Sequence, residues 1–234
     1  MRAEHPLILL SGLLSDETIW SDAAALLESR AMVRILAFPN FNSIVDMANH
    51  VLAEAPPQFA LAGHSMGGRV ALEVVRLAPG RVSKLGLFNT GIHPRHDSEL
   101  QSRGRLVELA LSRGMAALAA EWLPPMMGAS ERRRARVMPR LIQMVERATP
   151  DSFAAQTRAL LNRPDGAIAL KSVRVPTLLA SGSADTWSPL SQHEEMRQSL
   201  PSATLVAIED AGHMAPIEQP EAVSKALAAW LTNP

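Results

Sequence analysis

Residues 61–68, with the sequence LAGHSMGG, constrain the fold of this chain more than any other segment. An apolar run of strand length comes before the segment, and a stretch with the apolar spacing of a buried helix follows it. Between the two, the glycine-x-serine-x-glycine pattern predicts a sharp turn, because side chains at Gly63 and Gly67 would collide. Ser65 is then held at the tip of the turn in strained backbone geometry.

This turn places Ser65 where a nucleophile is needed. Its hydroxyl projects from the edge of the sheet, and the start of the following helix offers a free backbone N–H and a positive dipole to a developing oxyanion. A glycine-rich helix cap would give the same short pattern. The strand before the turn and the helix after it favour the nucleophilic serine.

Composition excludes several classes of function. The chain has 234 residues, 47% of them hydrophobic, and its 23 basic and 23 acidic side chains balance, so no electrostatic footprint for nucleic acid or an anionic membrane exists. No cysteine is present, which excludes disulfides and thiolate metal sites and is compatible with the cytoplasm, the location we expect. The apolar run at residues 6–10 is too short for a signal peptide or a membrane span. We expect a small-molecule substrate and either a monomer or a homodimer.

The order of apolar patterns predicts an α/β fold with a mainly parallel sheet and helices on both faces. Strand and helix patterns alternate over residues 1–88, where Ser15 is expected to cap the first helix. Residues 89–172 carry only helical patterns and are interpreted as a helical cap insertion, in which Pro139 should kink a helix or end it early. Strand character returns in residues 173–234, which complete the core.

A nucleophilic serine needs a histidine base and a carboxylate that orients the histidine. Both are expected in loops at the carboxyl ends of strands. Asp185 follows one such strand and His213 follows the next, which gives the order serine, aspartate, histidine that accompanies this type of turn. Asp210 is a weaker candidate for the acid. His64 adjoins the serine, but the turn should direct it away, so we assign it a packing role.

With these residues the chain resembles the α/β-hydrolase superfamily over nearly its full length, in particular its compact, esterase-like members with a helical cap. The resemblance is carried by Gly63-His64-Ser65-Met66-Gly67-Gly68, Gly182-Ser183-Ala184-Asp185, Ala211-Gly212-His213-Met214 and Glu218-Gln219-Pro220-Glu221-Ala222-Val223. It implies an oxyanion hole formed by the backbone N–H groups of Met66 and Leu13. It also implies that no metal, nucleotide or flavin cofactor is required.

Two segments depart from the pattern of these relatives. Most relatives carry His-Gly in the loop after the first strand, whereas this chain has Ser11-Gly12. They often have a glycine-rich turn where this chain has residues 38–43. Both departures bear on the subfamily and on local geometry more than on the fold.

The remaining tryptophans, methionines, arginines and histidines suggest pocket or ligand roles. Trp20, Trp122 and Trp187 are expected to line the substrate pocket. Methionines in the insertion suit either an adaptable apolar pocket or core packing. The arginine run at residues 132–136 suits an anionic substrate tail but more often marks a solvated helix face. His93 and His96 with Asp97 lack further ligands nearby for a metal site.

The sequence therefore predicts a serine hydrolase with Ser65, His213 and Asp185 as its catalytic residues. We expect it to cleave a small, largely uncharged carboxylic ester, thioester or lactone through an acyl-enzyme. Two alternatives stay open. The same three residues could serve carbon-carbon bond hydrolysis or an elimination, and the fold could act as a receptor for a small ligand.

Overall fold

The computed structural model describes residues 6–233 and is built on a six-stranded sheet in which all strands are parallel, in the order β2-β1-β3-β4-β5-β6. The strands are β1 (Pro6–Leu10), β2 (Met32–Leu36), β3 (Phe59–His64), β4 (Val82–Phe88), β5 (Thr177–Gly182) and β6 (Thr204–Ile208). Every residue of β3 and β5 is buried, as expected of central strands covered on both faces. The predicted α/β fold is confirmed.

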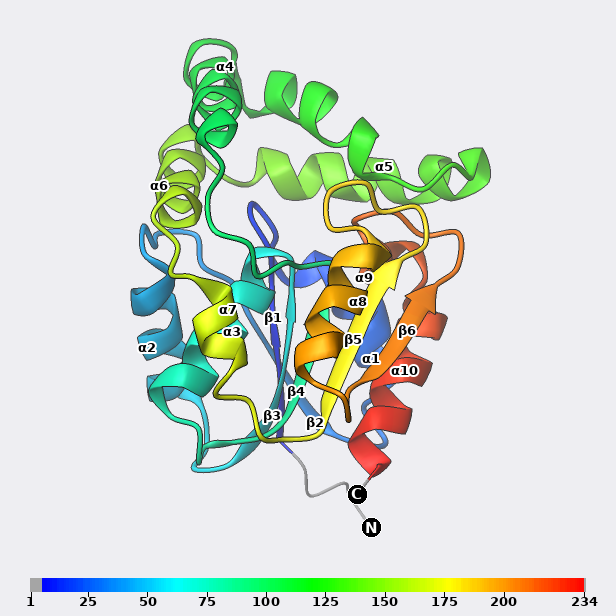
Figure 1. Cartoon of the computed structure of the whole chain (residues 1–234). Coiled ribbons are helices and arrows are strands. Elements are labelled where there is room, and N and C mark those ends of the chain that lie inside the picture. The colour runs from blue at the N-terminus through cyan, green and yellow to red at the C-terminus, as the bar shows by residue number, and fades with distance from the viewer. Residues whose placement is uncertain (1–5, 234) are drawn as a thin grey trace.

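Helices cover both faces of the sheet (Figure 1). One face carries α2 (Ile44–Glu54), α3 (Met66–Leu77), α7 (Gly166–Leu170) and α8 (Leu190–Ser199). The other carries η1 (Glu17–Ile19), α1 (Ser21–Ala25), α9 (Ala215–Glu218) and α10 (Pro220–Thr232). None of the helices within residues 6–233 combines the length and the apolarity needed to cross a membrane.

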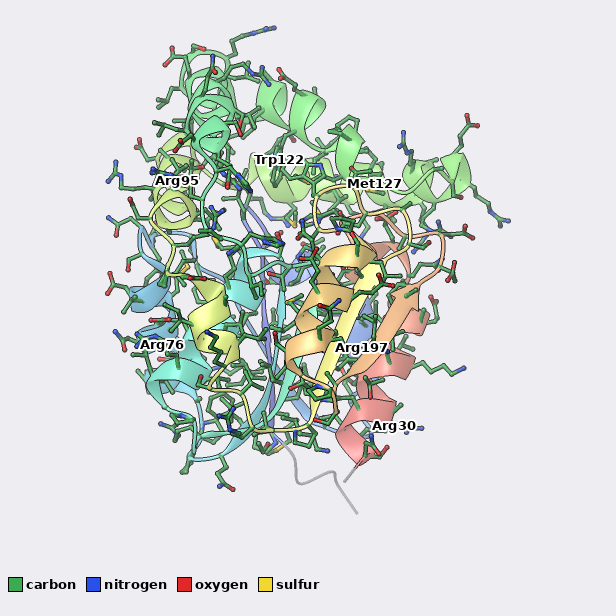
Figure 2. All side chains as sticks on the ribbon, viewed as in Figure 1. Arg30, Arg76, Arg95, Trp122, Met127 and Arg197 are labelled. Carbon is green, nitrogen blue, oxygen red and sulfur yellow. The ribbon has the colours of Figure 1, made fainter. Side chains whose placement is uncertain are left out.

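A separate layer of helices lies beyond the carboxyl ends of the strands, at the top of Figure 1. It consists of α4 (Asp97–Trp122), η2 (Pro124–Met126), α5 (Glu131–Glu146) and α6 (Pro150–Leu161). Gly114, with φ of 81°, breaks α4 into two segments. Trp122 and Met127 lie where this layer meets the sheet domain, whereas Arg30 and Arg197 extend outward from the opposite end (Figure 2). The carboxyl ends of the strands, where open α/β sheets place their sites, therefore face this layer.

One local expectation was wrong, and of the two outcomes expected at Pro139 the early end of the helix does not occur. Asp16, rather than Ser15, caps the first helical turn by accepting a hydrogen bond from the Thr18 N–H, and Ser15 is buried. Helix α5 also continues through Pro139 to Glu146. The carbonyl of Ala135, which Pro139 leaves without a helical donor, belongs to an exposed residue and is open to water, so the break costs less than in a buried helix.

Candidate active site

The turn between β3 and α3 holds Ser65 in a conformation that few residues adopt. Its φ and ψ are 54° and −116°. A Cβ on Gly63 would lie 2.2 Å from the Gly67 carbonyl oxygen, and one on Gly67 would lie 2.4 Å from that of Leu10, so neither glycine can be replaced without a shift of the backbone. The Thr90 hydroxyl donates to the Ser65 carbonyl at 2.7 Å and helps to fix the turn. Strain of this kind needs such support from its surroundings.

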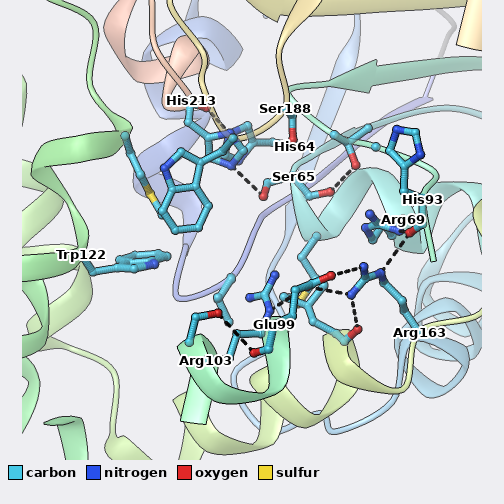
Figure 3. Close-up of a pocket in the computed structure, with 18 of the residues that line it drawn as sticks. His64, Ser65, Arg69, His93, Glu99, Arg103, Trp122, Arg163, Ser188 and His213 are labelled. Atoms are coloured by element: carbon cyan, nitrogen blue, oxygen red, sulfur yellow. Dashed lines mark hydrogen bonds and ion pairs between the residues drawn. The ribbon is translucent and has the colours of Figure 1, made fainter. Parts of the chain in front are cut away.

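The structure brings together the three residues that the sequence pointed to. The Ser65 Oγ and His213 Nε2 are 2.9 Å apart, and the His213 Nδ1 lies 2.9 Å from the Asp185 Oδ2 (Figure 3 shows the first contact). With Nδ1–H donating to the carboxylate, Nε2 is left to accept the serine proton. Asp210, the weaker candidate, is exposed, and the carboxylate that contacts His213 Nδ1 is that of Asp185. The backbone N–H of Asp210 donates to the Ser183 hydroxyl at 3.0 Å.

Four donors surround the Asp185 carboxylate. Its Oδ2 accepts from His213 and from the Asn89 side-chain amide at 2.8 Å, and its Oδ1 accepts from the N–H groups of Trp187 and Ser188 at 2.8 and 3.0 Å. Burial alone would raise the pKa of Asp185, but these hydrogen bonds, with that of His213 the strongest, hold it well below the usual value. The carboxylate is therefore ionised at neutral pH.

Asn89 is a site residue that the sequence analysis missed. It follows β4 directly, has a φ of 47°, and is fully buried. Asparagine tolerates the left-handed region better than most residues do. A buried-looking strand that ends in asparagine at the carboxyl edge of the sheet was a signal that could have identified it.

Glu218 connects the loop of His213 to the helical layer. Its two carboxylate oxygens accept hydrogen bonds from the N–H groups of Gly212 and Gly128, each at 2.9 Å. The His213 N–H donates to the Met126 carbonyl at 2.6 Å, so the same loop is tied a second time to η2. Burial raises the pKa of Glu218, while the backbone N–H groups of Gly128 and Gly212 oppose the rise. The position of the histidine thus depends on the helical layer as well as on the sheet.

His64 and Trp20 form a buried layer beneath the site. The His64 Nε2–H donates to the His213 carbonyl at 2.8 Å, so His64 also supports the histidine loop besides packing. Burial, followed by the proximity of His213, lowers the pKa of His64 to about 3, which keeps it neutral. Trp20 was expected to line the pocket, but it is fully buried, packs edge-on against His64 and donates to the Leu10 carbonyl at 3.1 Å. It therefore supports His64 and does not line the pocket.

The two residues whose backbone N–H groups are expected to stabilise an oxyanion, Leu13 and Met66, both line the pocket. Met66 is the first residue of α3, and N–H groups in the first turn of a helix have no intrahelical acceptor. Leu13 lies in the loop after β1, which the Ser11 hydroxyl orders by donating to the Asp16 carbonyl at 2.9 Å. Ser11 thus provides a loop contact of its own at the place where most relatives carry histidine.

Gln156 of α6 joins the two segments that depart from the pattern of relatives. Its Oε1 accepts from the Leu14 N–H at 2.8 Å, and its Nε2 donates to the Phe38 carbonyl at 2.7 Å. Gln156 is buried, and the two loops that it contacts lie at the ends of β1 and β2. The helical layer therefore holds the Leu13 loop as well as the His213 loop.

A pocket of about 360 Å³ opens beside Ser65, between the sheet and the helical layer (Figure 3). This volume lies in the range of small-molecule sites. Trp122 and Phe153 form an apolar wall with rings 6.4 Å apart, and Trp187, which is 41% exposed, lies 6.0 Å from the His213 ring. Of the three expected tryptophans, the pocket is thus lined by Trp122 and Trp187.

The opposite part of the pocket is charged, which the sequence analysis did not anticipate. Glu99 of α4 accepts from Arg163 at 2.6 Å and from Arg103 at 3.0 Å, and the Arg163 side chain is only 4% exposed. Arg69 of α3 lines the same pocket. The arginine run of α5 lies elsewhere: Arg133, Arg134 and Arg136 donate to backbone carbonyls of residues 210, 128 and 218 and do not line the pocket.

Replacing Glu99 by glutamine is expected to lower the free energy of unfolding by about 3 kcal/mol at pH 7. Although burial opposes it, hydrogen bonds from Arg163, the His96 N–H and Arg103 lower the pKa of Glu99 to about 2. A depressed pKa stabilises the fold above the unfolded-state value of 4.5, and this stabilisation is lost as the pH falls towards 2. Urea unfolding should therefore show a difference between the two proteins that shrinks on acidification. Glu108→Gln, at an exposed position of α4, serves as the control, and a constant difference would contradict the prediction.

Among residues 6–233, no group of three or more histidine, aspartate or glutamate side chains is arranged to hold a metal ion. His93 instead lies 3.5 Å from Glu195, and His96 precedes α4 as its cap.

Comparison with known proteins supports a common family. A family model described as the alpha/beta hydrolase family matches residues 7–226. A pimeloyl-[acyl-carrier protein] methyl ester esterase of Aromatoleum aromaticum is 26% identical, with 92% of this chain and 93% of that protein aligned. A thermophilic esterase of Thermogutta terrifontis, solved with malate bound, is 29% identical and has a TM-score of 0.88. The match covers 99% of this chain and 90% of that chain. The enol-lactonase of Burkholderia xenovorans, at 22% identity and a TM-score of 0.87, shares the fold over 99% of this chain and 93% of its own.

Proposed function

The chain belongs to the alpha/beta hydrolase family, and we propose that it is a serine hydrolase that cleaves a carboxylic ester, thioester or lactone through an acyl-enzyme. The observation that carries the proposal is the continuous hydrogen-bonded path from the Ser65 hydroxyl through His213 to Asp185, at the border of a small-molecule pocket. The esterases of Aromatoleum aromaticum and Thermogutta terrifontis, each similar over most of this chain, support ester cleavage as the reaction class.

The proposed reaction proceeds in two halves. His213 takes the proton of the Ser65 hydroxyl while the Ser65 Oγ bonds to the substrate carbonyl carbon. The N–H groups of Met66 and Leu13 stabilise the oxyanion that forms. Asp185 stabilises the histidine cation. His213 then gives the proton to the alcohol or thiol group, whose bond to the carbonyl carbon breaks. In the second half water takes the place of the serine hydroxyl, and the acid is released.

In this proposal residues 89–172 form a cap that encloses the substrate. Their side chains supply the apolar wall at Trp122 and Phe153 and the charged part around Glu99. Excluding water from the site strengthens the interactions with the oxyanion. The proposed steps require only groups of the chain and a water molecule, without a cofactor.

The test is a pre-steady-state measurement with p-nitrophenyl esters of increasing acyl length. We expect a burst of p-nitrophenol equivalent to the protein concentration, followed by slower turnover. A fluorophosphonate should abolish the burst and add its mass to the peptide that contains Ser65. Turnover of no ester in the series, together with no phosphonate adduct, would overturn the proposal and favour the carbon-carbon hydrolysis, elimination or receptor alternatives.

A further inference from the structure

Arg69 is a cation without an anionic partner in the part of the chain that the structure describes. Its guanidinium donates to the His93 carbonyl at 3.1 Å, and no carboxylate lies within ion-pair distance of it among residues 6–233. The nearby Glu99 is already shared between Arg103 and Arg163. The cluster thus has three guanidinium groups for one carboxylate and carries an excess of positive charge inside the pocket.

Arg69 differs from Glu73, the buried charged residue of the same helix, because Glu73 has an ionic partner in Arg76 at 2.6 Å. The residues that flank Arg69, Gly68 and Val70, are buried, and Arg69 itself is half-buried at the pocket wall. Burial, followed by the charge of Arg163, lowers the pKa of Arg69 to about 9, so it is still cationic at neutral pH. Burying a charge without a partner is unfavourable, and a ligand anion would relieve that cost.

The guanidinium is also held in place before any ligand arrives. The His93 carbonyl accepts from both Arg69, at 3.1 Å, and Arg163, at 3.3 Å, and Arg163 donates further to the Pro94 carbonyl at 2.9 Å. Residues 93 and 94 therefore fix the spacing of two guanidinium groups. A guanidinium that is held in this way binds a carboxylate with little further loss of side-chain freedom.

Arg69 lies close to the proposed nucleophile along the chain. Ser65 is the N-cap of α3, and Arg69 is the fourth residue of that helix. The same pocket includes both residues, together with the apolar side chains of Leu106, Trp122 and Phe153. An acyl chain that starts at Ser65 can therefore lie against apolar walls and end in a negatively charged group at Arg69.

We propose that Arg69, supported by Arg163, is an anion subsite that binds a carboxylate at the far end of the acyl chain, so that the substrate is a half-ester of a dicarboxylic acid or a lactone that carries a carboxylate. This inference rests on the proposed hydrolase function and names its substrate class. It replaces the expectation of a largely uncharged ester. One unpaired guanidinium matches one carboxylate, and the limited pocket volume suits a small acyl group.

The test compares matched substrates and matched variants. Monomethyl esters of dicarboxylic acids from succinic to suberic acid are paired with methyl alkanoates of the same length, and methanol release is measured. The native protein should prefer the monomethyl esters. Arg69→Met should lower kcat/KM for them by about 10- to 100-fold and leave the methyl alkanoates nearly unchanged, with partial recovery in Arg69→Lys. Arg197→Met, at an exposed position of α8, is the control.

Direct binding separates failure of this proposal from failure of the hydrolase proposal. Monomethyl adipate and methyl hexanoate are titrated calorimetrically into Ser65→Ala, with and without Arg69→Met. Tighter binding of monomethyl adipate that is lost with Arg69 supports the subsite whether or not the native protein hydrolyses esters. Equal binding of the two ligands, or no effect of Arg69→Met on the carboxylate-bearing one, overturns the subsite while leaving the reaction at Ser65 unaffected.

Discussion

Replacing Ser65 by alanine is expected to lower kcat for a p-nitrophenyl ester by about 10⁶-fold. The substitution removes the one oxygen that lies 2.9 Å from the His213 Nε2 and can bond to the substrate carbonyl. His213 then has no serine proton to accept. Only the pocket and the oxyanion donors contribute to the remaining rate. The pocket is unchanged, so ligand binding should be retained.

Steady-state kinetics and thermal unfolding of Ser65→Ala provide the measurement. Ser102→Ala is the matched control, because Ser102 also lines the pocket but is exposed on α4 and donates only within its helix. It should keep native kcat. A residual kcat within about tenfold of the native value in Ser65→Ala would rule out the acyl-enzyme at Ser65.

The parts of the fold that follow from local pattern could be predicted from the sequence. The apolar run before Gly63 and the helical spacing after Gly67 correspond to β3 and α3, and the helical patterns of residues 89–172 correspond to α4, α5, α6 and α7. At Pro139 a kink or an early end was expected, because sequence alone does not tell whether the carbonyl it leaves unpaired faces water.

Some residues of the candidate site stand in short sequence patterns, whereas others act through contacts with residues far away in the sequence. Ser65, Asp185 and His213 stand next to strand ends in short patterns, and the structure places them in hydrogen-bond contact. Gln156 accepts a hydrogen bond from Leu14, which lies 142 residues away in the sequence, and no local pattern predicts this contact. Arg69 did carry a local signal, as a charge four residues after the serine, but its significance depends on the nearby Glu99 being paired with Arg103 and Arg163.

Trp20 was expected to line the pocket but does not. It lies close to the Leu13 loop in sequence, and this proximity suggested a pocket residue. The chain folds it behind His64 because the indole is stabilised by full burial and by a hydrogen bond to the Leu10 carbonyl. Sequence proximity to a catalytic loop therefore does not decide on which side of the sheet a side chain lies.

Replacing Asp185 by asparagine is expected to lower kcat by about 10⁴-fold with little change in KM. Each oxygen of the carboxylate faces two donors: His213 and Asn89 at Oδ2, and the N–H groups of Trp187 and Ser188 at Oδ1. An asparagine places its NH₂ group against two of these donors in either orientation. With NH₂ towards His213, the histidine must accept at Nδ1 and carry its proton on Nε2, where it can no longer take the proton of Ser65.

The control for this prediction is Asp210→Asn, the acid that the sequence left as the weaker candidate. Asp210 is exposed, and its substitution should leave kcat unchanged because it makes no contact with His213 among the described residues. Both variants are compared with the native protein by steady-state kinetics, with near-ultraviolet circular dichroism to verify packing around Trp187. If kcat falls with Asp210→Asn and not with Asp185→Asn, the orienting carboxylate has been misassigned. If both variants keep native kcat, the reaction does not depend on a carboxylate that fixes the tautomer of His213, and the acyl-transfer mechanism proposed above does not hold.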